Sequence, residues 1–520
     1  MRTSLYRKVG LATLIMTASV FASRVIGLVR EMVIAHAAGA TGAVDAYQIS
    51  FILPEILNHI VASGFLSITF IPIFSRYLAE NKESEGWRVF NIILTGLGTV
   101  LLVLISIAVY LAPTLVAVFA PGIDDPALKA EAVKMTRIIL PAQFFFFAGG
   151  LFTAVQFAKE RFALPALAPL IYNLGIIVGG VLLGPHLGML GFSWGVLAGA
   201  FAGNFLLQYI GARRVGMRLV INWKLGHPDF RAYIYLTLPL MVGLTMTFST
   251  EIFLKFFGSF LPRGSIAGLN YALRIMLLLV GFFGQAVGVA SFPFMARLAV
   301  EKKIDEMNRL LNKTMRYLAL VIPLAALIMV LRHEVVLLLF QRGRFDAAAT
   351  ELTAGILVFM MIGAFAFAAQ TVVVRGFYAL QNTLFPAVFG TIAVVVSIPL
   401  YVIGMRVMGA KGVALAISVS VTLQVIFLFM IWNRQHDNKN SILVFTFLLK
   451  TVCLSIPLGI GLAWIRNYLA GWIDTATFSG CLLVVAIVGS LFITVLVAGA
   501  FLLRVGEIQR LIERMNPKSR

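Results

Sequence analysis

The sequence predicts an all-α polytopic membrane protein of about fourteen transmembrane helices, with two six-helix lobes in a parallel pseudo-twofold repeat and two further C-terminal helices. Three observations predict this fold class: an apolar composition, long apolar runs joined by short connections, and a pattern that recurs along the chain. Of the 520 residues, 60% are hydrophobic and 12% are charged. A soluble domain carries about twice that charged fraction, so the composition excludes a water-soluble multidomain protein.

The apolar residues occur in long runs rather than in amphipathic stripes. A run of about 20 apolar residues can cross a bilayer as a helix. The connections between the runs are too short to hold a soluble catalytic domain. The expected spans are residues 9–37, 45–75, 90–111, 135–157, 163–184, 188–210, 233–258, 267–295, 316–340, 353–378, 385–405, 411–432, 443–465 and 479–503.

Lysine and arginine concentrate in alternate connections, which is typical of cytoplasmic loops. The basic connections lie within residues 76–88, 159–161, 213–231, 297–316 and 434–439. Basic residues at both ends of the chain fall on the same side, so we expect both termini in the cytoplasm. We attribute the net charge of +20 to this topology and to contact with anionic membrane lipids. The sequence contains no nucleic-acid-binding module, so no nucleic-acid partner is expected.

Residues of the same type recur at an offset of about 221 positions. The matched pairs are Pro72 and Pro293, Arg76 and Arg297, Glu80 and Glu301, Lys82 and Lys303, Pro165-Ala166 and Pro386-Ala387, Gly188 and Gly409, and Gly191 and Gly412. One register that holds over about 120 residues indicates an internal duplication. The offset contains six spans, an even number, so both copies insert with the same orientation.

This repeat predicts three domains. Residues 1–218 form an N-lobe with helices 1–6, residues 219–436 form a C-lobe with helices 7–12, and residues 437–520 hold helices 13 and 14 with a basic tail. Duplicated membrane transporters commonly bind their substrate between the repeats, near the middle of the bilayer, and rock the repeats to expose it alternately to each side.

Three arginines lie inside expected spans: Arg24 and Arg30 in the first, and Arg274 in the eighth. Each is unfavourable in hydrocarbon by about 2.5–3.5 kcal/mol on insertion scales. A wet cavity that receives an anion would offset this penalty. Because the planar guanidinium makes two parallel bonds to phosphate oxygens, arginines from both lobes around one cavity would suit a diphosphate.

Acidic residues accompany these arginines in the first span and at the start of the second. Glu31 follows Arg24 by seven residues and shares a helical face with it, or it marks the outer interface together with Arg30. Asp45, at the start of the second span, is expected to be a helix cap or a gate partner for an arginine.

Two later clusters are further candidates for the cavity wall. Pro54 is expected to kink the second span, and the polar residues Glu55 and Asn58 follow it. In the seventh span, Glu251 and Lys255 are one turn apart, so a structural ion pair within the helix is expected.

The sequence shows no catalytic constellation. The six histidines have no metal-ligand spacing, and there is no phosphate-binding loop of the GxxxxGK[ST] type. We therefore expect a transporter rather than an enzyme, without a cofactor or metal. The sequence does not identify a coupling ion.

Several stretches together resemble a known family. They are Ala22-Ser23-Arg24-Val25-Ile26-Gly27-Leu28-Val29-Arg30-Glu31, residues 39–47, Phe51-Ile52-Leu53-Pro54, Phe70-Ile71-Pro72-Ile73, Tyr271-Ala272-Leu273-Arg274 and Arg375-Gly376-Phe377-Tyr378-Ala379-Leu380-Gln381-Asn382-Thr383. In these stretches, and over essentially its whole length, the chain resembles the MurJ (MviN) family of lipid II flippases, within the multidrug/oligosaccharidyl-lipid/polysaccharide exporter superfamily.

The resemblance implies a role for particular residues. Arg24, Arg30 and Arg274 match the essential cavity arginines of the family, and Ser23 and Asp45 match further functional positions. The implied substrate is lipid II, the undecaprenyl-diphosphate-linked peptidoglycan precursor. The chain would move it from the cytoplasmic to the outer leaflet of the bacterial inner membrane by alternating access. Helices 13 and 14 would bind the polyprenyl tail, and the cell-wall synthesis machinery is an expected partner.

The chain departs from the family pattern in its second span. It has Asn58 where the family usually has arginine and Glu55 where asparagine is common, and both changes make the cavity less positive. Two alternatives therefore stay open: a flippase for another polyprenyl-linked saccharide, and a drug or cation antiporter of the same superfamily.

Overall fold

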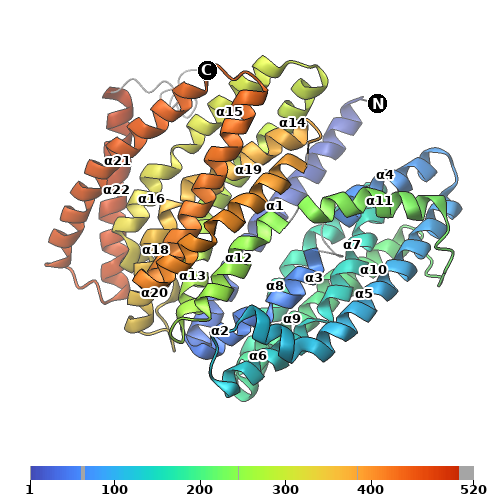
Figure 1. The fold of residues 1–520 in the computed structure, drawn as a ribbon, viewed down its shortest axis with the longest axis horizontal. Helices are drawn as coiled ribbons and strands as arrows, with labels where there is room; N and C mark the ends of the chain where they lie inside the picture. Colours follow the sequence, from blue (N-terminus) through green and yellow to red (C-terminus); the bar gives the residue numbers. More distant parts are fainter. Residues whose placement is uncertain (1, 60–64, 244, 383, 503–520) are drawn as a thin grey trace. The chain divides into compact units, whose positions relative to one another are not determined.

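The structure, a computed structural model, describes residues 2–59, 65–243, 245–382 and 384–502. These form helices joined mostly by short turns, with a longer connection from Val215 to His227 (Figure 1). No strand occurs in these ranges. The predicted all-α class is therefore confirmed. The predicted basic tail from Arg504 to Arg520 lies outside the described residues, as do residues 60–64 of the second expected span.

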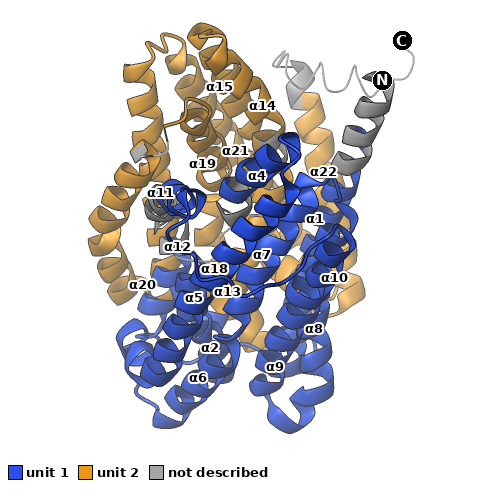
Figure 2. Cartoon of the chain, turned by 90° about the vertical axis from the view of Figure 1, so that its right-hand side faces the viewer, with its two compact units in different colours: residues 1–267, 342–346 blue, residues 268–341, 347–520 orange. Residues whose placement is uncertain are grey.

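The chain divides into two compact units, which Figure 2 distinguishes by colour. The first unit comprises Met1–Ala267 and Arg342–Asp346. Its helices are α1 (Arg2–Ala38), α2 (Gly42–Ser50), α3 (Ile52–Leu57), α4 (Phe65–Ala79), α5 (Glu83–Phe119), α6 (Pro126–Ile139), α7 (Ala142–Ala158), α8 (Ala163–Leu187), α9 (Met189–Gly199), the π-helix η2 (Ala200–Leu206), α10 (Leu207–Arg214), α11 (Pro228–Gly243) and α12 (Thr245–Gly258).

The second unit comprises Gly268–Gln341 and Ala347–Arg520. Its helices are α13 (Ser265–Val280, whose first residues belong to the first unit), the π-helix η3 (Gly281–Gln285), α14 (Ala286–Val300), α15 (Ile304–Leu318), α16 (Val321–Val330), α17 (Arg332–Phe340), α18 (Ala347–Ile362), α19 (Ala364–Ala379), α20 (Leu384–Gln435), α21 (Ser441–Ala470) and α22 (Phe478–Leu502). Since α11 and α12 belong to the first unit, the units do not follow the expected lobe boundary at residue 218, and the lobes stay a prediction.

The described helices cover the expected spans, although several spans are broken into shorter helices. By length and hydropathy, nine helices in the described part of the chain could cross a membrane, or ten if α18 and α19, which meet at a bend of 44°, form one span. The described part of the second expected span holds α2, α3 and α4, with a break at Phe51 between α2 and α3. Pro54 accounts for this break, because its ring nitrogen cannot donate to the carbonyl one turn earlier. The count of about fourteen is consistent with this arrangement.

The internal duplication is visible in the helix bounds. Helix α4 ends at Ala79 and α14 ends at Val300, a shift of 221. The starts of α5 and α15 (residues 83 and 304) and of α6 and α18 (residues 126 and 347) show the same shift. Several helices of the duplicated segments therefore begin at matching places, although α5 is one helix where the second repeat has α15, α16 and α17.

Backbone conformations repeat in the same register. Three pairs of residues share a left-handed φ: Asn81 (56°) and Lys302 (55°), Glu160 (57°) and Gln381 (59°), and Gly188 (57°) and Gly409 (59°). In the last pair the glycine turns the chain between two helices that pack side by side, α8 and α9 in the first unit and the two halves of α20 in the second. Only glycine adopts this conformation without strain.

Each unit has its own apolar core. In the first unit, aromatic residues such as Phe74, Phe90 and Phe152 pack with residues of α4, α5, α7 and α11. In the second unit, Leu331 packs with Leu462 of α21 and with residues of α22. Of the helices that carry candidate site residues, α3 contributes Leu53 to the core of the first unit.

Candidate functional site

Arg30 is held in a defined orientation on α1. This helix packs against α8, where Asn173 accepts a hydrogen bond of 3.0 Å from Nη1 of Arg30. Nη2 of Arg30 lies 2.6 Å from Oε1 of Glu31. The Asn173 amide itself donates to the carbonyl of Pro169 at 2.9 Å, which turns its oxygen toward the arginine. A guanidinium fixed in this way needs little reorganisation to bind an anion.

Arg24 has a different environment, although it lies only six residues earlier on the same helix. Its side chain is exposed, as are its apolar neighbours Val20, Phe21 and Val25, and Ser23 is half-buried. Glu31 by contrast is only 2% exposed. Arg24 and Glu31 were expected to share one face of the helix. Arg24 does not have the buried environment of Glu31, and Glu31 pairs with Arg30.

Glu55 and Lys255 form an ion pair between α3 and α12. Nζ of Lys255 lies 2.8 Å from Oε2 of Glu55, and the two side chains are 4% and 27% exposed. Lys255 thus binds an acid from another helix and not Glu251, its expected partner one turn earlier. Burial makes each charge depend on the other, because an uncompensated ion in this setting is strongly unfavourable.

The remaining polar residues expected in this region are half-buried. Asn58 follows α3, and Glu251 lies on α12, one turn before Lys255. The first unit therefore brings Glu55, Asn58 and Lys255 to two helices joined by an ion pair.

Asp45 caps a helix other than its own. It is 7% exposed on α2, and its two carboxylate oxygens accept hydrogen bonds from the backbone N–H groups of Gly264 (2.5 Å) and Ala267 (2.7 Å). These amides belong to the first turn of α13 and the residue before it, where unsatisfied donors favour a carboxylate. Gly264 has a φ of +88°, and a Cβ there would lie 2.2 Å from the carbonyl oxygen of Ala40.

Arg274 lies in the second unit, on α13. It is half-buried between the buried residues Leu273 and Ile275. Arg24 and Arg30 belong to the first unit. The convergence of the three arginines on one chamber therefore stays a prediction.

A buried ion pair that was not predicted joins α17 to α21. Glu334 is fully buried, and its Oε1 lies 2.6 Å from Nε of Arg466. The available signal was an acid in α17 and an arginine in the largely apolar α21. Their pairing depends on the packing of α21 and was not readable from local sequence.

Arg375, in one of the family-like stretches, also occupies a constrained position. Its guanidinium lies so close to Gly288 of α14 that a Cβ at this glycine would be 2.3 Å from Nη1. The absence of a side chain at residue 288 therefore makes room for the arginine of α19.

Comparison with known proteins then identifies the family. Residues 34–483 match the sequence profile described as "Lipid II flippase MurJ". This match covers most of the chain. The chain belongs to the MurJ family.

Individual relatives agree with this assignment. The chain is 29% identical over 421 residues to the lipid II flippase MurJ of Burkholderia cenocepacia, a match covering 78% of the chain and 80% of that relative. It is 28% identical over 427 residues to a protein of Thermotoga maritima named "Probable lipid II flippase MurJ", with coverage of 82% and 86%.

Solved structures show the same fold. A structure described as "Lipid II flippase MurJ, inward closed conformation" matches with a TM-score of 0.76 and 22% identity, covering 94% of this chain and all of that one. An inward-facing multidrug resistance MATE family transporter of the MOP superfamily matches with a TM-score of 0.67 and 12% identity, covering 81% and 96%. As a member of the MurJ family, the chain is a multi-pass membrane transporter and not an enzyme.

Proposed function

We propose that this chain moves lipid II from the cytoplasmic to the outer leaflet of the bacterial inner membrane, for peptidoglycan synthesis, and that Arg24, Arg30 and Arg274 bind the diphosphate. Its membership of the MurJ family supports the transport of lipid II. Both termini would lie in the cytoplasm. The two repeats would rock about the bound headgroup and expose it alternately to each side.

The observation that carries the role of the arginines is the contrast along α1. Arg30 is fixed by Glu31 and Asn173, whereas Arg24 is exposed. This contrast suits a ligand that enters and leaves the site. The fixed guanidinium of Arg30 would define the position of the phosphate, and the accessible guanidinium of Arg24 would then bind it as well.

The ion pair of Glu55 with Lys255 bears on the alternative saccharides. Glu55 would make a diphosphate site less positive, but Lys255 balances its charge at 2.8 Å. Lys255 therefore offsets the charge of Glu55. It does not replace the arginine that the family usually has where this chain has Asn58, so lipid II is proposed from membership of the family.

The membrane potential can drive the proposed movement. An inside-negative potential favours outward transfer of negative charge by about 2.3 kcal/mol per charge per 100 mV. The two charges of a diphosphate would thus supply several kcal/mol without ATP.

Complementation tests the proposal. Cells depleted of this protein and supplied with Arg24→Ala or Arg274→Ala should accumulate lipid II in the inner leaflet, and headgroup labelling from outside should fall. The exposed Arg406→Ala on α20 is a matched control that should export normally. Normal external labelling in Arg24→Ala cells with normal protein levels would refute the role of the arginine.

The same cells separate the alternatives. Accumulation of another polyprenyl-linked saccharide with normal lipid II would replace the substrate but keep the flippase. Normal lipid-linked precursors together with sensitivity to toxic cations would favour the antiporter.

A further inference from the structure

The two units contain the same charged corner between successive helices. In the first unit, Arg76, Glu80, Lys82, Glu85 and Arg88 surround the turn from α4 to α5. In the second unit, residues of identical type occur at the same spacing around the turn from α14 to α15, at Arg297, Glu301, Lys303, Glu306 and Arg309. The backbone also matches, because Asn81 and Lys302 share a left-handed φ in the two turns. The corners therefore start from the same structure.

In the first unit this corner is filled by another segment of the chain. Nη2 of Arg76 lies 2.8 Å from both carboxylate oxygens of Asp229, in the first turn of α11. The hydroxyl of Tyr77 also donates to this carboxylate. Beneath these bonds, Ile73 of α4 is 7% exposed and belongs to the same apolar core as Tyr233 of α11. The corner thus binds a helix start through one carboxylate and adjoining apolar residues.

The connecting segment explains how α11 reaches the corner. After α10 the chain runs without helix from Val215 to His227. Asn91 of α5 accepts from the N–H of Val220 and donates to the carbonyl of Arg218. These bonds guide the segment along α5 toward α4.

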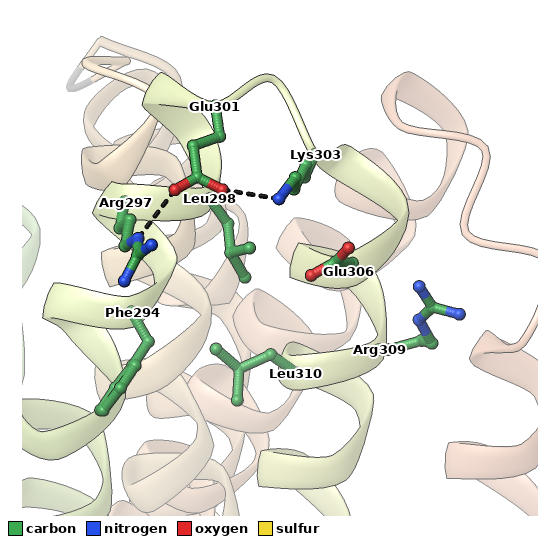
Figure 3. Close-up of a pocket in the computed structure, with 8 residues that line it drawn as sticks. All are labelled: Phe294, Arg297, Leu298, Glu301, Lys303, Glu306, Arg309 and Leu310. Carbon is green, nitrogen blue, oxygen red and sulfur yellow. Dashed lines mark hydrogen bonds and ion pairs between the residues drawn. The ribbon is translucent and has the colours of Figure 1, made fainter.

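In the second unit the matching corner is an open pocket of about 480 Å³ (Figure 3). Arg297 and Lys303 both bind Glu301, at 2.7 and 2.8 Å. These hydrogen bonds, that of Lys303 first, lower the pKa of the Glu301 carboxyl to about 2. Glu301 therefore supplies the anion that Asp229 supplies in the first unit.

An apolar surface is left open beside this pocket. Phe294, at the position in α14 that matches Ile73 in α4, is 65% exposed and lines the pocket with Leu298 and Leu310. The reason is again the connecting segment. After α20 the chain enters α21 at Ser441, so no extended segment of this kind follows the second repeat.

We propose that the α14–α15 pocket is a docking site for a partner protein, which presents a helix start with a carboxylate in its first turn and an aromatic residue beside it. The carboxylate would bind Arg297 in place of Glu301, and the aromatic residue would cover Phe294. The predicted topology puts Arg297, Glu301 and Lys303 in a cytoplasmic connection and Phe294 at the cytoplasmic end of the eighth expected span. The occupant resembles Pro228-Asp229-Phe230 at the start of α11, because that segment fills the matching corner.

A peptide copying residues 224–235 is the probe. Its affinity is measured by fluorescence anisotropy for the full-length protein in nanodiscs of zwitterionic lipid. We expect saturable binding that weakens about tenfold on Arg297→Ala and about tenfold when the peptide carries Asp229→Asn, since each change removes a charge-assisted hydrogen bond. Arg76→Ala is the matched control, and it should leave the binding of the peptide unchanged.

A second variant tests the competition that the geometry implies. Glu301→Gln removes the internal carboxylate from Arg297, so the peptide should bind severalfold more tightly, whereas Glu80→Gln in the first unit should have no effect. The proposal would be overturned if the peptide of residues 224–235 and its Asp229→Asn form bound equally well. It would also be overturned if Arg76→Ala weakened the binding and Arg297→Ala did not. The peptide is also tested in nanodiscs with anionic lipid, at matched ionic strength. If its binding were lost there, the pocket would be assigned to lipid headgroups and the proposal of a partner protein would be overturned.

Discussion

The two units share a backbone skeleton but use their charges differently. Helix bounds and left-handed residues repeat at a shift of 221 positions, so the duplicated parts fold alike. The first unit joins α3 to α12 through Glu55 and Lys255. The second joins α17 to α21 through Glu334 and Arg466. Turns and helix ends are set by nearby residues and survive duplication, whereas side-chain partners depend on the segment that follows each repeat.

The buried ion pairs should show the largest difference between the units. Arg466→Ala leaves Glu334 fully buried without its partner, so we expect a loss of about 3–5 kcal/mol in unfolding free energy. Lys255→Ala should cost less, about 1–3 kcal/mol, because Glu55 is 27% exposed and water can reach its carboxylate. Unfolding in detergent by increasing denaturant measures both.

A double variant separates charge from packing in that experiment. Glu334→Gln added to Arg466→Ala should recover part of the loss, because no ion is then left buried. If Lys255→Ala proved more damaging than Arg466→Ala, burial would not be the quantity that ranks the two pairs.

Close backbone contacts should be equally intolerant in both units. A Cβ at Gly149 would lie 1.8 Å from the carbonyl oxygen of Asn204, and one at Gly412 would lie 1.8 Å from that of Gly404. Replacing either glycine by alanine should destabilise its unit by about 1–3 kcal/mol through overpacking. Gly459→Ala, where the nearest atom is 3.9 Å away, is the control and should keep the wild-type melting temperature.

The repeated helix turn gives a matched test of the shared skeleton. Gly188 and Gly409 have φ values of 57° and 59°. Alanine should cost about 1–3 kcal/mol at either position, and nearly the same amount at both, because the two glycines share a φ and ψ that other residues rarely adopt. Thermal unfolding of the two variants in one detergent compares them. Losses that differ by more than about 1 kcal/mol would show that the two turns are not equivalent.

The charged corners should show the smallest effect. Arg76→Ala should cost about 0.5–1 kcal/mol, since its pair with Asp229 is partly screened by water. Arg297→Ala should leave the unfolding transition unchanged.

The effect of Arg76→Ala should depend on pH. Burial raises the pKa of Asp229, but the hydrogen bonds from Tyr77 and Arg76 outweigh it, so the pKa is lowered overall. A carboxyl with a lowered pKa stabilises the fold above its unfolded value, about 3.9, and loses this contribution as the pH falls through the folded value. The wild type should therefore keep its higher unfolding free energy relative to Arg76→Ala until the pH falls below the unfolded pKa of Asp229. An advantage that persists undiminished at pH 2 would contradict the role of this carboxylate.

The sequence was sufficient for the features that depend on local pattern. Apolar runs predicted the helices, the offset of matching residues predicted the duplication, and Pro54 marked the break after α2. The partners of charged residues were harder to predict. Glu55 and Lys255 are 200 positions apart, and Asn173 reaches Arg30 only because α1 packs on α8. Such pairs require knowledge of which helices touch.

Spacing along one helix also led to the wrong partner for a charged residue. The pairing of Lys255 with Glu251 was expected from their spacing on one helix, but a buried lysine binds the acid that packing brings to it. Asp45 was expected to be a helix cap or a gate partner for an arginine, and its carboxylate caps the start of α13 through amides more than 200 positions away. The role of the arginines was inferred from their type and their place in expected spans, and it stays a prediction.

We propose that Arg24, Arg30 and Arg274 bind one diphosphate. The affinity of the purified protein for lipid II tests this most directly. Native mass spectrometry of the purified protein can compare lipid II with undecaprenol, which has no phosphate. We predict that Arg24→Ala and Arg274→Ala each weaken lipid II binding by about tenfold and leave undecaprenol binding unchanged. Wild-type affinity for lipid II in either variant would contradict the claim.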